Sequence, residues 1–203
     1  MRDVLLPPTE KRKHFELRAL ALRDFAGVNA NQPLDPFALA KFAKLLVVDF
    51  NSIEGLSPES RERLLSEGAE EWSGGACSRP LPNGWRLVIL NPAHGKQRNR
   101  ATLMEEVSHV FLGHTPNRLA VISSARPNRR TLARDYNHDD EEAAYAIGAA
   151  ALVPYSSLRQ LVIKGRTAQE IARHFHVSRQ LVEYRIKVTH LWPEYKRASA
   201  TSG

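Results

Sequence analysis

Residues 143–154 are the stretch that most limits how this chain can fold. They read AAYAIGAAALVP and are small and apolar all round. A helix of this kind has no polar face to turn to water, so it belongs inside the protein. Its small side chains allow close packing against another helix. The acidic residues just before it, at 139–142, suit a helix N-terminus because the helix dipole is positive there.

A second helix is predicted over residues 102–114, and it carries the pattern Glu105-Glu106-x-x-His109. Residues four apart on a helix share a face, so Glu105 and His109 can bind one ion while Glu106 lies beside it as a base. Catalytic zinc takes three protein ligands and a water molecule, which a neighbouring carboxylate deprotonates. The usual motif begins with His, but a carboxylate is an acceptable zinc ligand. The pattern indicates a zinc-peptidase helix with one altered ligand.

The same pattern also fits an exposed helix, where Glu and His form an ordinary solvated pair. The surrounding residues favour a buried helix, because apolar residues at helical spacing predict one buried stripe: Leu103, Val107, Val110 and Phe111. Gly113 stands where a left-handed C-terminal residue is expected. The added charge of Glu105 favours harder ions such as manganese or magnesium over zinc. A third ligand should come from residues 139–142, although helix-dipole stabilisation alone explains any one of these acids.

Together the two helices resemble the ImmA/IrrE family of small cytoplasmic metallopeptidases, in which a His-Glu-x-x-His helix precedes one of the type Glu-x-Glu-Ala-x-x-x-Ala-x-x-Leu-Leu-x-Pro. Counting back from Pro154 places Glu141 on the first glutamate of that second pattern. The resemblance implies Glu106 as catalytic residue and the metal ligands Glu105, His109 and Glu141, with Glu142 as the alternative to Glu141. Zinc is the expected metal; manganese, another divalent ion or no metal are the alternatives.

The resemblance also implies a fold and an activity. The fold would be α+β: a small zincin-like domain of gluzincin type, with a mixed sheet of few strands packed on the active-site helix and a helical C-terminal segment. The activity would be that of an endopeptidase that cleaves or controls a helix-turn-helix repressor. The strand at 85–90, with Trp85, Leu87 and Ile89, would pair with an extended substrate. The alternatives are an inactive module that binds a protein partner and a DNA-binding regulator.

Residues 167–187 have helix-turn-helix spacing, with Thr167 and Ser178 as caps and His176 at the turn. From residue 155 onward, nine Lys or Arg residues face three acidic ones. As a DNA reader the segment would present Arg179, Gln180, Arg185 and Lys187. DNA binding is not favoured, since two packed basic helices can equally buttress the catalytic domain.

The chain divides into a helical extension at 1–30, a metallopeptidase-like domain at 31–158, a helix-turn-helix-like segment at 159–193 and a flexible tail at 194–203. Within these ranges we predict helices from Thr9 to about residue 27, from Pro36 and at 58–65. Strands are predicted at 45–50, 71–77 and 85–90. A further strand at 119–123 precedes a polar loop at 126–135.

The composition fits a cytoplasmic protein. The single cysteine, Cys77, excludes an internal disulfide framework. No apolar run approaches the roughly 18–20 residues that span a bilayer, so no membrane contact is expected, and the oligomeric state is left open. The net charge of +7 permits an acidic partner or nucleic acid. His114 misses the metzincin spacing, so we predict that it contacts helix-end carbonyls; the alternative is that it rotates into the site.

Overall fold

The computed structural model describes residues 5–66, 68–77, 79–114 and 138–201, with side chains to residue 198. The helices are α1 Glu10–Phe25, α2 Pro36–Phe42, α3 Pro58–Leu65, α4 Lys96–Leu112, α5 His138–Leu152, α6 Tyr155–Ile163, α7 Ala168–Phe175, α8 Arg179–Val188 and α9 Trp192–Thr201. The strands are β1 Leu45–Val48, β2 Gly74–Ala76 and β3 Arg86–Leu90, and a 3-10 turn, η1, spans Phe50–Ser52. The strand predicted at 119–123 and the loop predicted at 126–135 lie outside the described residues.

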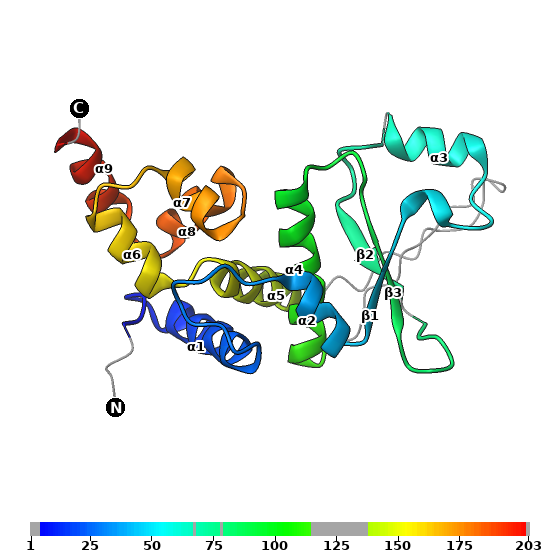
Figure 1. Ribbon diagram of the computed structural model, residues 1–203, viewed down its shortest axis with the longest axis horizontal. Coiled ribbons are helices and arrows are strands. Elements are labelled where there is room, and N and C mark those ends of the chain that lie inside the picture. Colours follow the sequence, from blue (N-terminus) through cyan, green and yellow to red (C-terminus); the bar gives the residue numbers. More distant parts are fainter. Residues whose placement is uncertain (1–4, 67, 78, 115–137, 202–203) are drawn as a thin grey trace.

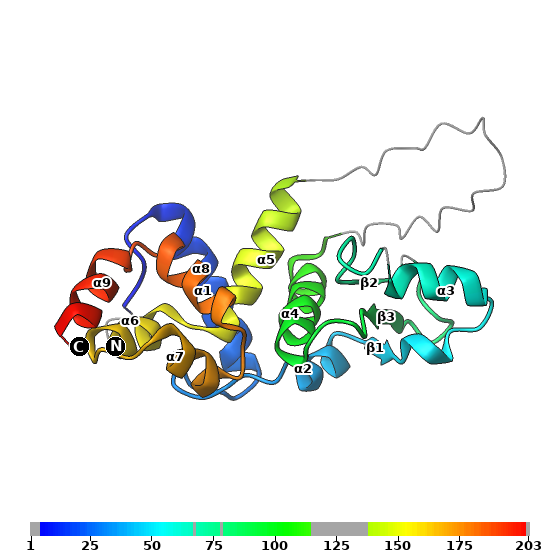
Figure 2. The ribbon, with the colours of Figure 1, turned by 90° about the horizontal axis from the view of Figure 1, so that it is seen from above.

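Helix α4 stands between a small sheet and a group of helices (Figures 1 and 2). The sheet and α3 lie on one side of α4, and α5 with α1 and the C-terminal helices lies on the other. One core cluster of buried side chains includes residues of the sheet, α4, α5 and the C-terminal helices. The α+β fold with a small mixed sheet and a helical C-terminal region is therefore as predicted.

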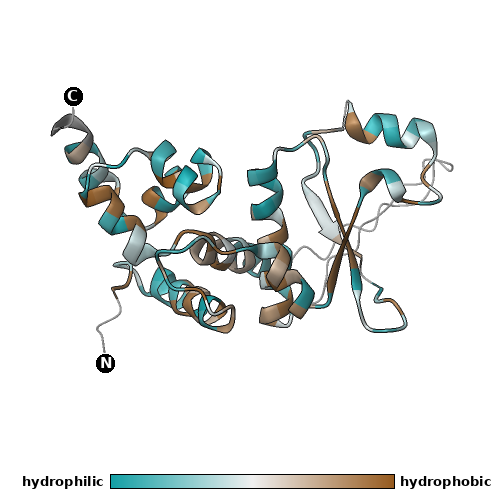
Figure 3. Cartoon of the chain, viewed as in Figure 1, coloured by the Kyte–Doolittle hydropathy of each residue, from teal (hydrophilic) through white to brown (hydrophobic). Residues whose placement is uncertain are grey.

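The sheet has the order β1-β3-β2, with β1 parallel and β2 antiparallel to β3. Strand β1 and all of β3 after Arg86 are hydrophobic (Figure 3), as expected of adjacent strands packed against a helix. Helix α4 passes so close to β2 that a side chain at Gly74 would meet the Thr102 methyl group at 2.9 Å. A glycine at this position lets α4 lie directly on the sheet.

Helices α4 and α5 also approach each other closely. A Cβ atom at Gly148 would lie 3.3 Å from the backbone of Met104 and 3.3 Å from the Ser108 hydroxyl. The small apolar stretch of α5 is buried, as its composition predicts. The stripe predicted for α4 is correct at Leu103 and Val107, but Val110 and Phe111 are 36% and 43% exposed. The stripe fails there because α4 buries the face of Met104 and Ser108 instead.

Local capping by side chains is present at four of the described helices. Asp35, Ser57, Thr167 and Ser178 accept backbone hydrogen bonds at the starts of α2, α3, α7 and α8. His176 has a φ of 57° at the turn between α7 and α8. The flexible tail predicted from residue 194 is wrong, because Trp192–Thr201 forms α9. Tyr195 anchors that helix by accepting a hydrogen bond from the Ala168 backbone at 3.0 Å.

A buried ion pair joins the first helix to the C-terminal segment. Arg185 donates to Glu16 at 2.6 Å, and these side chains are only 2% and 1% exposed. Glu16 also accepts the Tyr155 backbone N–H at 2.6 Å, and Arg185 donates to the Val153 carbonyl at 3.0 Å. The pair therefore fastens α1, the α5–α6 junction and α8 to one another.

No single helix in the described part of the chain is long and apolar enough to cross a membrane. Helices α5 and α6 reach that length and hydropathy only jointly, with a bend of 55° between them.

Replacing Glu16 with glutamine leaves Arg185 buried without a counter-charge. We expect this variant to lose about 3–5 kcal/mol of unfolding free energy, as is typical when one partner of a buried pair is removed. The matched control is Glu183→Gln, which breaks the exposed pair with Arg179 and should leave the urea midpoint nearly unchanged. Urea unfolding followed by circular dichroism measures both, and equal shifts would contradict a special role for the buried pair.

Candidate metal centre

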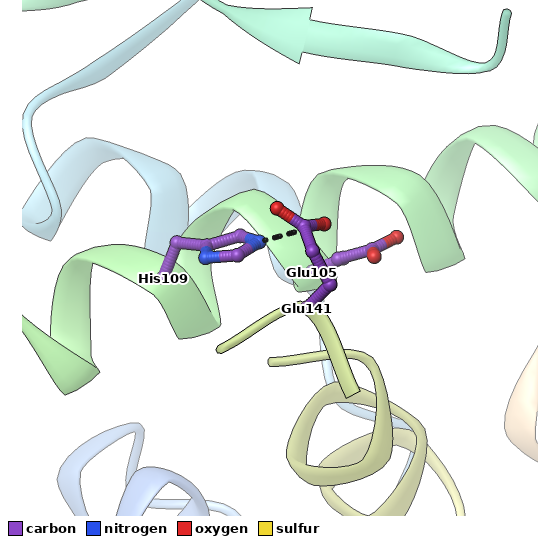
Figure 4. A group of neighbouring side chains, drawn as sticks. All are labelled: Glu105, His109 and Glu141. Atoms are coloured by element: carbon purple, nitrogen blue, oxygen red, sulfur yellow. Dashed lines mark ion pairs between the residues drawn. The ribbon is translucent and has the colours of Figure 1, made fainter. Parts of the chain in front are cut away.

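Helix α4 presents Glu105 and His109 on one face, and α5 brings Glu141 to the same place (Figure 4). One ligand atom from each of these residues lies within 4.8 Å of the others. His109 Nε2 is 3.6 Å from the Glu141 carboxylate. The side chains are partly buried, and their positions follow from the buried faces on which α4 and α5 meet. Three side chains with metal-binding atoms therefore converge at the crossing of the two helices.

Burial and mutual repulsion change the acidity of the carboxyl groups. Burial, then the charges of Glu106 and Glu141, raises the pKa of Glu105 from 4.5 to about 8. Burial and Glu141 raise the pKa of Glu106 to about 7, although a backbone hydrogen bond with Ala76 acts in the opposite direction. Burial lowers the pKa of His109, against the carboxylates of Glu141 and Asp140. In the metal-free protein Glu105 and Glu106 therefore hold their protons to higher pH than free carboxyl groups do.

This donor set fits a divalent ion. Carboxylate oxygen and imidazole nitrogen are both accepted zinc ligands at roughly 2.0–2.2 Å, and their separations allow a common centre after small side-chain shifts. A cation here would also relieve the repulsion that raises the pKa values of Glu105 and Glu106. Manganese would fit the two carboxylates at least as well as zinc.

Glu142 points to different partners. It binds Lys11 at 2.7 Å and lies 3.8 Å from Arg12 of α1. With His138 and Asp139 it forms another group whose ligand atoms lie within 4.8 Å of one another, near the exposed start of α5. The arrangement therefore favours Glu141 over Glu142 as the third residue of the centre.

His114 lies beside the centre, and its backbone N–H donates to the His109 carbonyl at the helix end, as predicted. Its Nδ1 is 3.1 Å from His109 Nδ1, and its Nε2 is 3.3 Å from the Asp140 carboxylate. Gly113 has a φ of 71°, and this left-handed turn folds His114 back against the last turn of α4. Spacing rules for known motifs miss such a contact, whereas a glycine followed by histidine at a helix end is a usable signal for it.

A cavity of about 380 Å³ opens beside Glu105. Helices α4, α5 and α8 and the residue before β2 contribute its walls, which include Ser73, Arg98, Thr102, Tyr145, Ser178 and Gln180. Burial, then Tyr184 and Glu105, raises the pKa of Tyr145 to about 12, so its phenol stays protonated as a hydrogen-bond donor. The cavity places a neutral donor and a mixed polar wall next to the candidate centre.

Residues 75–187 match the model of a peptidase family described as the IrrE N-terminal-like domain. The match covers more than half of the 203-residue chain. This chain belongs to that family. The resemblance inferred from the two helical motifs is confirmed, and with it a metallopeptidase-like domain. Neither the curated proteins nor the solved structures gave a match to the chain.

The range matched by the IrrE N-terminal-like family contains all four predicted metal and catalytic positions. It also runs past the boundary predicted at residue 158 and includes α7 and most of α8. The helices with helix-turn-helix spacing therefore fall within the family's matched range.

The substrate strand predicted in this IrrE-like domain is wrong. β3, which carries Leu87 and Ile89 and follows Trp85, is the central strand and is hydrogen-bonded on both sides by β1 and β2. A central strand has no free edge to offer an extended peptide. Among the described residues, β2 has a strand on one side only, and it lies next to α4. The edge near the centre is therefore that of β2.

The predicted nucleic-acid contacts do not form one exposed surface on this family member. Arg185 is buried against Glu16, so it cannot reach a phosphate. Gln180 lines the cavity beside Glu105, and Arg179 donates to Glu183 at 2.7 Å. Lys187 is exposed. Arg185 is therefore excluded as a DNA contact, whereas Arg179, Gln180 and Lys187 are exposed.

The raised pKa of Glu105 predicts how the stability of the metal-free protein depends on pH. Because the folded-state pKa of about 8 lies above the ordinary 4.5, folding is favoured at low pH and this contribution is lost as pH rises through about 8. We expect the melting temperature of the metal-free protein to fall between about pH 5 and 9. Glu105→Gln should flatten part of this decline, since Glu106 still contributes.

The control for this measurement is Glu62→Gln, which changes an exposed glutamate of α3. It should follow the wild-type pH profile in thermal unfolding monitored with a chelator present. A Glu105→Gln profile as steep as that of the control would show that burial and the neighbouring carboxylates do not raise the pKa of Glu105 on folding.

Proposed function

We propose that this protein is a metal-dependent endopeptidase, with Glu105, His109 and Glu141 as ligands and Glu106 as the general base. The convergence of these three ligand residues, with Glu106 beside them in sequence, carries the proposal. When bound, the divalent ion would polarise the scissile carbonyl and acidify a water molecule. The pKa of about 7 for Glu106 suits a group that takes a proton near neutral pH.

The chain's own residues also suggest how a substrate is held. An extended peptide would pair with the edge of β2, whose Ala76 backbone forms a hydrogen bond with Glu106. One substrate side chain would enter the cavity beside Glu105, where the Tyr145 phenol can donate to a developing oxyanion. Main-chain pairing would give affinity, and the cavity would give selectivity.

The substrate we propose is a helix-turn-helix repressor, which the family resemblance suggests. The competing hypothesis is an inactive module that keeps the fold to bind such a protein, because Glu105 stands where the usual motif has histidine. Metal content separates these hypotheses. Purified protein should hold close to one zinc or manganese per chain, and protein that stays metal-free when both ions are supplied would contradict the enzyme.

Replacing Glu106 with glutamine removes the base and leaves the three ligands in place. We expect cleavage of an unfolded protein substrate to fall by about 10²–10⁴-fold, the usual contribution of a general base. Metal content, measured by elemental analysis, should stay at the wild-type level. Glu71→Gln, a change to an exposed glutamate, is the control and should keep full activity. Unchanged cleavage by Glu106→Gln would assign the base to another residue.

Replacing Glu105 with histidine restores the usual motif. Imidazole in place of a carboxylate favours zinc over harder ions, so the zinc-to-manganese affinity ratio should rise by at least about tenfold. Competition with a chromophoric chelator measures both affinities. The same ratio in wild type and variant would mean that Glu105 is not a ligand.

A further inference from the structure

We propose that Asp140 and His114 are positioning residues that fix the tautomer of His109, so that its Nε2 lone pair faces the ligand cluster. This inference rests on the proposed function, because His109 is the ligand that they would orient. Neither Asp140 nor His114 belongs to the proposed ligand set or to the base. Both lie in contact with one another, and His114 also contacts His109.

The argument begins with the pair of nitrogens that face each other. His109 Nδ1 and His114 Nδ1 are 3.1 Å apart, which is a hydrogen-bond distance. Two neutral imidazoles can form that bond only if one nitrogen carries the hydrogen and the other carries a lone pair. The direction of this bond therefore decides which nitrogen of His109 is protonated.

Asp140 sets the direction of that bond. Its carboxylate lies 3.3 Å from His114 Nε2 and can only accept, so that nitrogen carries a hydrogen. A neutral His114 then has a lone pair at Nδ1 and accepts from His109 Nδ1–H. His109 is left with a lone pair at Nε2, the atom 3.6 Å from Glu141. A carboxylate acting through a histidine thus prepares the second histidine as a ligand.

The opposite tautomer of His109 is also supported by one contact, which Asp140 and His114 must outweigh. If His109 carried its hydrogen at Nε2, it could donate to the Glu141 carboxylate. That arrangement would tie two proposed ligands to each other and leave no lone pair at Nε2 for an ion. Asp140 and His114 oppose it from the other side of the ring, over shorter distances of 3.3 and 3.1 Å.

Backbone geometry holds His114 and Asp140 in position beside His109. The His114 backbone N–H donates to the His109 carbonyl at 3.0 Å after the left-handed Gly113. The side chains of His114 and His109 are 14% and 12% exposed, so water has little access to their contact. Asp140 precedes Glu141 in the first turn of α5. One helical turn therefore supplies both a proposed ligand and the carboxylate that orients the other ligand.

The test reads the tautomer directly in the full-length, metal-free protein. Long-range ¹H–¹⁵N spectra of ¹⁵N-histidine-labelled protein distinguish Nδ1–H from Nε2–H, and comparison with His109→Gln assigns the His109 signals. Wild type should show His109 as Nδ1–H. His114→Leu and Asp140→Leu should shift it towards Nε2–H. His114→Gln should restore Nδ1–H, because its side-chain carbonyl can accept the same hydrogen bond.

Zinc affinity gives a second readout. His114→Leu should bind zinc about 10–100-fold more weakly, the usual effect of losing an outer-shell partner, and His114→Gln should recover most of that loss. The control is His14→Leu, at an exposed histidine of α1. Two results would overturn the proposal. One is a wild-type His109 that carries its hydrogen at Nε2, and the other is a His109 that keeps its hydrogen at Nδ1 in His114→Leu. Wild type that binds neither zinc nor manganese would end the proposed function instead, while the metal-free spectra would still decide the tautomer.

Discussion

The close contact between α4 and α5 is the constraint on which the rest of the molecule depends. Gly148 lies against the backbone of Met104, and the surrounding residues of α5 are small and fully buried. Larger side chains along this stretch would hold the helices apart and separate Glu141 from His109. The requirement for close packing therefore explains both the composition of α5 and the position of the candidate centre, since each helix carries part of it.

The parts of the fold that could be predicted from the sequence are those encoded locally. The two helices of the centre, the caps at Ser57 and Thr167 and the left-handed turn at Gly113 follow from short patterns. The strand order does not, because β1 and β3 are distant in sequence and pair through contacts that no local pattern specifies. For this reason the prediction that the strand at 85–90 pairs with a substrate was wrong.

The C-terminal segment shows a second limit of sequence reasoning. A basic residue on a predicted recognition helix looks the same whether it faces solvent or a buried acid, and Arg185 faces Glu16, a residue 169 positions away. Similarly, α9 is short and polar, and a hydrogen bond from the Ala168 backbone to the Tyr195 hydroxyl ties it to the start of α7. Helices of this length depend on tertiary contacts more than on propensity.

The electrostatics of the centre bear on whether a site with Glu105 can work. A second carboxylate ligand makes the ion less electrophilic, so a bound water would lose its proton less readily and would need a stronger base. Burial, then the charge of Glu141, raises the pKa of Glu106 to about 7 in the metal-free protein. Glu106 is therefore a stronger base than a free carboxylate, which is what a site with a less electrophilic ion would need.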